Sequence, residues 1–249
     1  IKHNDTIPSS LWTPNIMKLL HVDSSITGAN SVSRELSQFV VDQLRQQNDQ
    51  VQVEHVDLAL NPPPHFSADS LGMRLGLDPA TLSERQRAEN AITEQYLNQF
   101  LASDVVVIGA PFYNFTIPSQ LKAWMDRLAQ AGRTFRYTSN GPEGLAGDKT
   151  VYLVLSRGGI YSESEQGQAM EHQESYLRVM FGFMGVTDLR TVQPGALGGH
   201  QRCGRAARRG ARATSGRAPH TSARPRRCAS PPRSAAPRRC GRSPRRRCA

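Results

Sequence analysis

The segment Val105-Val106-Val107-Ile108-Gly109-Ala110-Pro111 is the stretch of sequence that decides the fold. An uninterrupted β-branched run of this length predicts a strand buried on both faces, which is typical of a parallel sheet covered by helices. A second apolar run at 151–155 has the same character. Because ligands bind beyond the carboxyl ends of the strands in such sheets, the residues that follow each run are candidates for a binding site.

Strand-like and helix-like segments alternate along the chain. We expect strands at 18–23, 51–56, 105–109, 151–155 and 187–192, helices at 32–44, 84–101, 117–128 and 166–184, and loops at 61–69 and 132–147. Ser83 and Gln86 form a capping box, Pro118 is tolerated in a first helical turn, and Asn140-Gly141-Pro142 marks a turn. This alternation predicts an α/β fold, and five strands favour a doubly wound, flavodoxin-like parallel sheet of order 2-1-3-4-5. A closing helix is expected after the fifth strand.

The charge of the chain is concentrated at one end. Residues 195–249 hold 16 arginines and no acidic residue, whereas residues 1–194 hold 15 basic and 21 acidic residues, a net charge of −6. A basic balance usually favours a nucleic-acid partner, but here it belongs to the tail alone. All four cysteines lie in the same tail, so the rest of the chain shows no sign of a disulfide framework. Their spacing gives no CxxC pair, so we expect no zinc site in the tail.

Three segments follow from these patterns. Residues 1–16 form a polar extension that we expect to be non-native, because Met17 stands directly before the first strand pattern. Residues 17–197 form the folded domain. Residues 198–249 form a low-complexity Arg/Ala/Pro/Cys tail, and its scarcity of large apolar residues predicts disorder. No apolar stretch approaches the ~20 residues of a membrane span, and no signal-peptide core is present, so we expect a cytoplasmic protein without a membrane partner.

The tail admits three interpretations. It is a cationic arm that binds nucleic acid or anionic membrane through phosphates, a solvated linker, or a frameshifted translation of GC-rich codons. The abrupt change of composition, at the place where a helix is expected, favours the frameshift.

The first candidate loop carries Ser25 and then Ser31-Val32-Ser33 at the start of a helix. Ser31 suits an N-cap, and one reading of the loop is capping alone. The other is an anion cradle, in which helix N-terminal amides and serine hydroxyls hold a phosphate. The loop has neither Gly-x-x-x-x-Gly-Lys nor Gly-x-Gly-x-x-Gly, which excludes an ATPase-type loop and argues against a tightly held dinucleotide.

Two further loops follow the apolar runs. Pro111 leads into Phe112-Tyr113-Asn114-Phe115, which are either core aromatics or a wall whose amides and Asn114 bond the edge of a planar ligand. Ser156-Arg157-Gly158-Gly159 is either an ordinary turn or a place where the backbone approaches such a ligand closely, with Arg157 neutralising charge. All three loops belong to one rim of the sheet. An anion cradle combined with aromatic and glycine walls favours a flavin.

The domain offers no catalytic constellation of its own. His21, His55, His65 and His172 show no metal-ligand spacing, and His21 within a strand reads as a satisfied core residue. Residues 17–197 contain no cysteine and no Gly-x-Ser-x-Gly elbow, so no nucleophilic triad is expected. We therefore predict no metal and no certain catalytic side chain, with the chemistry carried by a bound cofactor.

Over residues 17–197 the chain resembles the FMN-dependent NADH-azoreductases and NAD(P)H quinone oxidoreductases of flavodoxin-like fold. Phe112 stands where that family usually has Met, and the Arg/Cys tail replaces the family's Ala-rich last helix. The similar segments are Leu19-Leu20-His21-Val22-Asp23-Ser24-Ser25, Ser31-Val32-Ser33, Ala110-Pro111-Phe112-Tyr113-Asn114-Phe115, Ala131-Gly132-Arg133-Thr134-Phe135-Arg136-Tyr137, Asn140-Gly141-Pro142-Glu143-Gly144-Leu145 and Ser156-Arg157-Gly158-Gly159.

The resemblance implies a homodimer with its active site at the subunit interface, where Phe135 and Tyr137 would lie on the substrate side. It also implies ping-pong turnover, in which NADH (or NADPH) gives a hydride to the flavin and leaves, and an azo compound or quinone then takes it. The residues it implies for FMN binding are Ser25, Ser31, Val32, Ser33, Pro111, Phe112, Tyr113, Asn114, Phe115, Ser156, Arg157, Gly158 and Gly159.

Two other classes of function stay open from the sequence. A flavodoxin-like electron carrier would pass single electrons to another protein, whereas the reductase accepts two electrons directly from NADH. A nucleic-acid-binding protein would act through the basic tail, and trimming residues 198–249 would abolish that binding. We expect the small-molecule reductase and regard nucleic acid as the weaker alternative.

Overall fold

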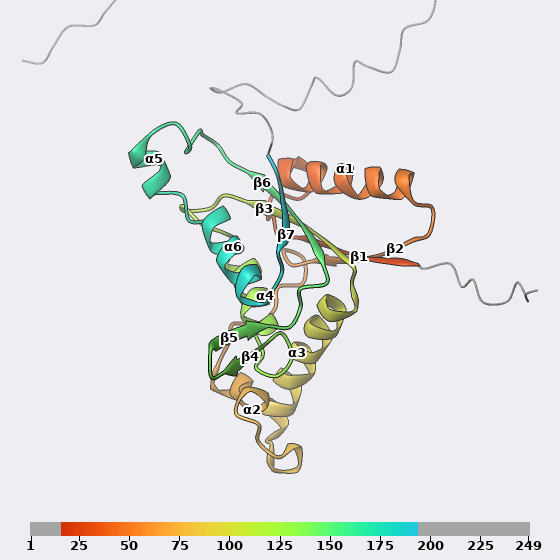
Figure 1. Cartoon of the computed structure of the whole chain (residues 1–249), viewed down its shortest axis with the longest axis vertical. Coiled ribbons are helices and arrows are strands. Elements are labelled where there is room, and N and C mark those ends of the chain that lie inside the picture. Colours follow the sequence, from red (N-terminus) through yellow and green to blue (C-terminus); the bar gives the residue numbers. More distant parts are fainter. Residues whose placement is uncertain (1–15, 194–249) are drawn as a thin grey trace, which may run out of the picture. The chain divides into compact units, whose positions relative to one another are not determined.

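A five-stranded parallel sheet forms the centre of the structure, a computed structural model that describes residues 16–193. Its order is β2-β1-β3-β6-β7, and every neighbouring pair is parallel (Figure 1). In chain order this is 2-1-3-4-5, which confirms the predicted topology. The strands are β1 (Met17–Asp23), β2 (Val51–Asp57), β3 (Val105–Pro111), β6 (Thr150–Ser156) and β7 (Asp188–Val192).

Helices cover both faces of this sheet. On one face, Val40 and Val41 of α1 (Val32–Gln47) pack with strand residues such as Leu19 and Val107. On the other face, α3 (Glu84–Ala102), α4 (Ser119–Leu128) and α6 (Glu174–Phe183) build a larger core. Figure 1 shows α1 on the opposite side of the sheet from these three helices. The shorter helices are α2 (Leu71–Arg74), α5 (Glu165–Ala169) and the 3-10 helices η2 (Gly28–Asn30), η3 (Ala68–Ser70) and η4 (Pro79–Thr81).

Burial follows the position of each strand in the sheet. All seven residues of β3 are buried, as the uninterrupted apolar run predicts for a central strand. By contrast, β2 is only partly buried and lies at a sheet edge, as expected from its alternating sequence. The predicted capping box of α3 is also present, because the Ser83 hydroxyl accepts from the Gln86 amide and the Gln86 side chain accepts from the Ser83 amide.

The segment at 132–147, predicted as a loop, contains an antiparallel hairpin of β4 (Phe135–Thr138) and β5 (Gly141–Gly144). The predicted turn residues do reverse the chain, with Gly141 at a φ of 110°. The strands were missed because they carry little apolar pattern. Tertiary contact decides instead: a Cβ on Gly144 would lie 2.1 Å from the backbone nitrogen of Gly185, so glycine lets the hairpin reach the end of α6.

The helix predicted at 166–184 is two helices, α5 and α6, separated by residues 170–173. A carboxylate explains the new start, because Glu171 Oε1 accepts from the backbone amides of Gln173 and Glu174, each at 2.8 Å. The helix predicted at 117–128 begins at Ser119, with Pro118 at the N-cap position, not inside the first turn.

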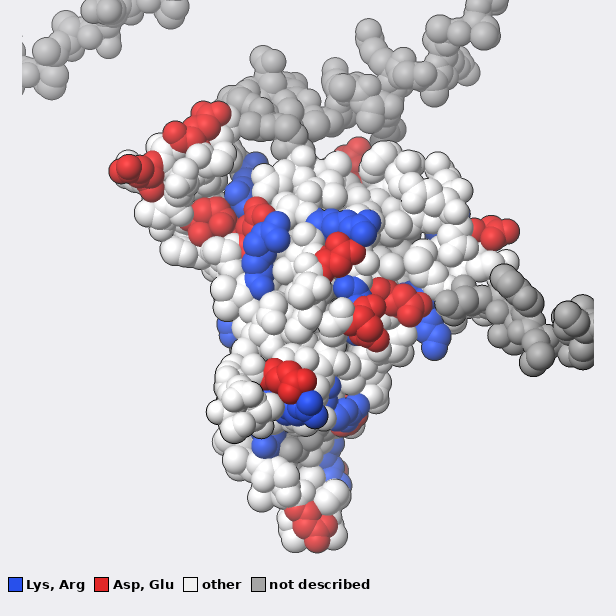
Figure 2. All heavy atoms as spheres, viewed as in Figure 1, with Lys and Arg blue, Asp and Glu red and all other residues white. Residues whose placement is uncertain are grey.

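Apart from Ile16, the extension predicted at 1–16 lies outside the described residues, and so do residues 194–249, which include the closing helix and the basic tail. Among the helices of residues 16–193, none combines the length and apolar character needed to cross a membrane. Figure 2 shows acidic and basic side chains interspersed on the visible face, so this face forms no single basic patch.

Candidate functional site

A cavity of about 370 Å³ lies where three loops leave the carboxyl ends of β1, β3 and β6. It therefore occupies the predicted rim of the sheet. Ten of the residues predicted for the site line it: Ser25, Ser31, Val32, Pro111, Phe112, Tyr113, Ser156, Arg157, Gly158 and Gly159. The structure adds lining residues that the sequence analysis missed: Thr27, Asn30, Leu155, Ile160, Tyr161, Ser162 and Gln193.

Hydroxyl groups gather at the end of the cavity beside α1. Ser31 is the N-cap of α1, and its Oγ accepts from the backbone amide of Arg34 at 3.2 Å. The hydroxyl of Ser33 lies 3.0 Å from that of Ser31, but Ser33 is buried and is absent from the cavity lining. Ser25 and Thr27 place two further hydroxyls 3.0 Å apart. A helix N-terminus surrounded by hydroxyl donors is suited to an anion.

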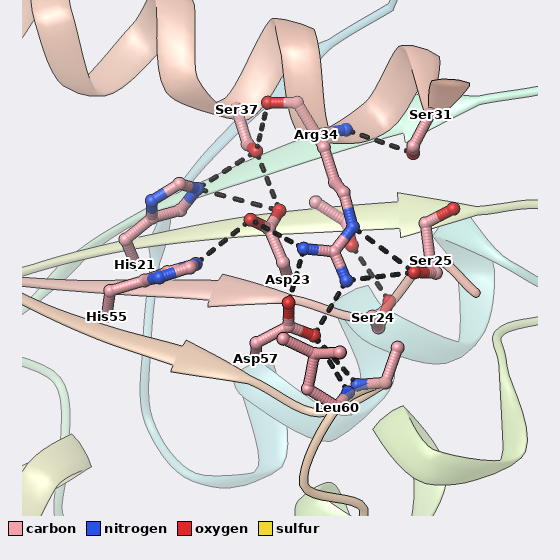
Figure 3. A network of polar contacts seen from close by, with 12 residues as sticks. His21, Asp23, Ser24, Ser25, Ser31, Arg34, Ser37, His55, Asp57 and Leu60 are labelled. Atoms are coloured by element: carbon pink, nitrogen blue, oxygen red, sulfur yellow. Dashed lines mark hydrogen bonds and ion pairs between the residues drawn. The ribbon is translucent and has the colours of Figure 1, made fainter. Parts of the chain in front are cut away.

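A salt-bridged arginine holds the first loop in place (Figure 3). The Arg34 guanidinium donates twice to the carbonyl of Ser25, at 3.2 and 2.9 Å, and also to both carboxylate oxygens of Asp57. Burial alone would raise the pKa of Asp57. Hydrogen bonds from Arg34 and from two backbone amides outweigh burial, so the pKa of Asp57 is lowered. Gln120 of α4 adds a bond of 2.6 Å to the carbonyl of Ser24. The sequence analysis overlooked all three residues.

The aromatic loop after β3 is a tight turn. Tyr113 and Thr116 exchange two backbone hydrogen bonds of 2.9 and 3.0 Å, and Asn114 and Phe115 between them have φ values of 47° and 71°. Two central residues with positive φ define a type I′ turn, which is uncommon without glycine. The turn carries Asn114 and Phe115 out of the main cavity. Asn114 lines a neighbouring cavity of about 540 Å³, and Phe115 is 48% exposed.

The loops after β3 and β6 are joined to each other. The Phe112 amide donates to the Ser156 carbonyl at 2.8 Å, and the Phe112 ring lies 4.6 Å from the ring of Tyr161. The space beside Gly158 is open, because a Cβ built there would meet no atom within 4 Å. The wall therefore combines two aromatic rings with backbone that a flat ligand can approach.

Arg157 is tied into the protein by several acceptors. Its guanidinium lies 3.1 Å from Glu171 and 3.4 Å from Glu174, and its Nε donates to the side chain of Gln173 at 3.1 Å. Gln173 is fully buried and also donates to the Ala110 carbonyl at 2.9 Å. Gln173 thus connects the end of β3 to the loop after β6, a role that the sequence analysis did not find.

The predicted substrate-side residues lie away from this cavity within the described chain. Phe135 of β4 is buried, with its ring 4.6 Å from that of Phe183. Tyr137 is 75% exposed, and neither residue is part of the cavity lining.

These features match a known fold. The family model described as the flavodoxin-like fold matches residues 17–214. The chain belongs to this flavodoxin-like family. The match agrees with the sheet order, with the cavity at the carboxyl ends of the strands, and with the family resemblance drawn from the sequence.

Relatives and solved structures give the same assignment. A protein of Albidiferax ferrireducens named FMN-dependent NADH:quinone oxidoreductase is 62% identical over 71% of this chain and 87% of its own length. One of the same name from Polaromonas naphthalenivorans is 59% identical over 71% and 81%. An azoreductase structure from Bacillus anthracis is 35% identical, with a TM-score of 0.66 over 71% of this chain and 86% of its own. An FMN-dependent NADH-azoreductase of that species, solved with FMN, is 25% identical at a TM-score of 0.65, with the same coverage.

Proposed function

We propose that this flavodoxin-like protein is an FMN-dependent oxidoreductase that takes a hydride from NADH and reduces quinones and azo compounds. One observation carries the proposal: a single cavity joins the hydroxyl-rich N-terminus of α1 to a wall of aromatic rings and glycine backbone. Those two ends suit the phosphate and the flat ring system of FMN, respectively. The names of the relatives and of the solved structures point to the same reaction.

The residues present fit the cofactor at both ends. Ser31 and the amides of the first turn of α1 would hold the phosphate, with Ser25 and Thr27 adding hydroxyls. The backbone from Pro111 to Tyr113 and from Ser156 to Gly159 would bind the ring. At Gly158 a side chain would project into open space, so glycine keeps that space for a ligand. Ser33, Asn114 and Phe115 lie outside the lining of this cavity. We propose that these three residues support the loops around it.

FMN, when bound, supplies the two-electron chemistry by accepting a hydride and giving it to a second substrate. The chain's own side chains bind, orient and exclude water. Phe112 and Tyr161 offer an apolar wall against which a flat substrate can stack. Arg157 is paired with Glu171 and Glu174, so its charge is balanced within the protein and its part is to hold the loop after β6.

A homodimer in the cytoplasm belongs to the same proposal. Ile26 lines the neighbouring cavity with Asn114, and Ile26 is 70% and Phe115 48% exposed. Large apolar side chains exposed beside a binding site are typical of surfaces that a partner covers. In this arrangement the exposed Tyr137 would reach the substrate side of the second subunit's site, with the buried Phe135 packed against its ring at 5.5 Å. Sedimentation equilibrium of the full chain tests the dimer, and a monomer at micromolar concentration would refute it.

The enzymatic proposal is tested by the visible absorption of the purified chain after FMN is added and the excess removed. We expect one retained FMN per chain that bleaches in a single two-electron step with anaerobic NADH and recovers when a quinone or azo dye is added. Retained FMN that NADH does not reduce, but that a one-electron donor does, would favour an electron carrier. No retained FMN would refute the cofactor assignment.

A further inference from the structure

Two histidines and an aspartate from the neighbouring strands β1 and β2 lie together on one face of the sheet (Figure 3). His21 of β1 is the register partner of His55 of β2, and Asp23 lies two residues beyond His21, so alternation directs His21 and Asp23 to the same side. His21 Nε2 lies 3.6 Å from Asp23 Oδ1, and His55 Nε2 lies 3.0 Å from Asp23 Oδ2. One ligand atom from each residue falls within 4.8 Å of the others.

These separations suit a small metal ion. Zinc bonds of about 2.0–2.2 Å in tetrahedral geometry place ligand atoms roughly 3.4 Å apart. The two contacts of 3.6 and 3.0 Å go to different oxygens of Asp23, so the side chains would draw together from their spread of up to 4.8 Å when an ion binds. His21 and Asp23 are buried, whereas the side chain of His55 is 48% exposed. The carboxylate and one imidazole are therefore held by the protein interior, and an ion can enter from the side of His55. Water can then supply the fourth ligand.

Neighbouring groups orient the three side chains. Ser37 of α1 donates to Asp23 Oδ1 at 2.9 Å, and its hydroxyl also lies 2.9 Å from His21 Nε2. Gly109 leaves room for the carboxylate, because a Cβ there would lie 2.6 Å from Asp23 Oδ1. Outer groups of this kind fix ligand orientation in metal sites.

The local charge balance also favours a cation. Leaving the two imidazoles out of the count, Asp23 and Asp57 contribute two negative charges and Arg34 one positive charge. Arg34 is bonded mainly to Asp57, with its Nη1 3.6 Å from Asp23 Oδ2, so it does not fully neutralise the buried Asp23. The cluster thus carries one net negative charge beside a cleft of about 500 Å³ that Asp23 and Asp57 line.

We propose that His21, Asp23 and His55 form a binding site for a divalent transition metal ion, with Zn²⁺ as the best match. Two imidazoles and one carboxylate are a ligand set that suits zinc and disfavours Mg²⁺ and Ca²⁺, which prefer oxygen ligands. To bind the ion, each imidazole takes the tautomer with its proton on Nδ1, so that the Nε2 lone pair replaces the hydrogen bonds that Nε2 makes to Ser37 and Asp23. The ion would join edge strand β2 to β1, and β1 leads directly into the loop that carries Ser25. This site does not depend on the FMN proposal.

The test is zinc binding by calorimetry to the full chain, without added FMN. Its four cysteines lie at 203, 228, 240 and 248 and are first alkylated, because thiolates would otherwise bind zinc. We expect His55→Asn to lose one equivalent of Zn²⁺, or to bind it at least about tenfold more weakly. The matched control is His65→Asn, an exposed histidine outside the cluster, which should keep that equivalent.

A second measurement guards against a folding defect in the variants. ZnCl₂ should raise the thermal unfolding midpoint of the wild type and of His65→Asn, but not that of His55→Asn or His21→Asn. The circular dichroism spectra of the last two variants without zinc show whether they are folded. Co²⁺ should give the visible absorption of a four-coordinate site in the wild type, and His55→Asn should abolish it. Equal zinc stoichiometry and affinity in the wild type and His55→Asn, or identical Co²⁺ spectra, would overturn the proposal.

Discussion

Gln173 gives the sharpest test of how the cavity is held together. Its side chain is fully buried, donates to the Ala110 carbonyl at 2.9 Å and accepts from Arg157 Nε at 3.1 Å. Gln173→Met keeps nearly the same length and volume but removes both hydrogen bonds. Because the two partners come from the end of β3 and from the loop after β6, the change should loosen the walls of the candidate cofactor cavity as well as the fold.

The expected magnitude follows from the two groups left behind. A buried polar group that loses its partner costs about 1–3 kcal/mol. Ala110 is completely buried, so its carbonyl falls in the upper part of that range. Arg157 keeps two carboxylate partners and a side chain 12% exposed, so its share is smaller. The sum is about 3 kcal/mol, which for a domain of this size lowers the unfolding midpoint by roughly 6–12 °C.

Urea unfolding of the chain without FMN measures the free energy, and fluorescence quenching measures the FMN dissociation constant. The matched control is Gln168→Met, which removes an exposed hydrogen bond to the Ser162 carbonyl and should change stability by less than about 0.5 kcal/mol. FMN affinity should fall with Gln173→Met and not with Gln168→Met. A loss below about 1 kcal/mol for Gln173→Met, with FMN affinity unchanged, would refute the reasoning.

Three more outcomes are expected. Gly158→Leu should weaken FMN binding at least about tenfold, or ~1.4 kcal/mol. The unfolding midpoint without FMN should stay constant, since a Cβ at this position meets no atom within 4 Å. An unchanged dissociation constant would place the flavin ring elsewhere. Ser31→Ala should cost about 1 kcal/mol of stability by removing an N-cap and should weaken FMN more than riboflavin, whereas Ser83→Ala, which removes the N-cap of α3, should cost as much in urea unfolding without that selectivity. Another reading frame of the coding DNA past codon 197 should encode an Ala-rich amphipathic helix. If no frame encodes one, the frameshift interpretation of residues 198–249 is wrong.

Much of the fold was readable from local patterns. The run of β-branched residues at 105–108 predicts a central strand because such a strand is buried on both faces. Ser83 and Gln86 predict the start of α3 because the two partners of a capping box lie three residues apart. The three candidate loops were found for a similar reason, since each directly follows an apolar strand.

Errors arose where distant residues decide. The helix predicted at 166–184 is broken because Glu171 caps a new start at Glu174, and Arg157, 14 residues earlier in the chain, binds both carboxylates. The hairpin at 135–144 depends on close packing of Gly144 against Gly185. Neither contact leaves a periodic signal in its own segment.

By itself, the sequence determined the order of the five strands of the main sheet, its buried centre and most of the loop residues that line the candidate cavity. Periodicity and capping act between neighbours in the chain, so they can be read without coordinates. Only the tertiary structure decided that Asn114 and Phe115 turn away from the cavity, and that His21 and His55, 34 residues apart, face each other across β1 and β2. Strand register selects which side chains share a face, and that register depends on packing of the sheet against the helices on both of its faces.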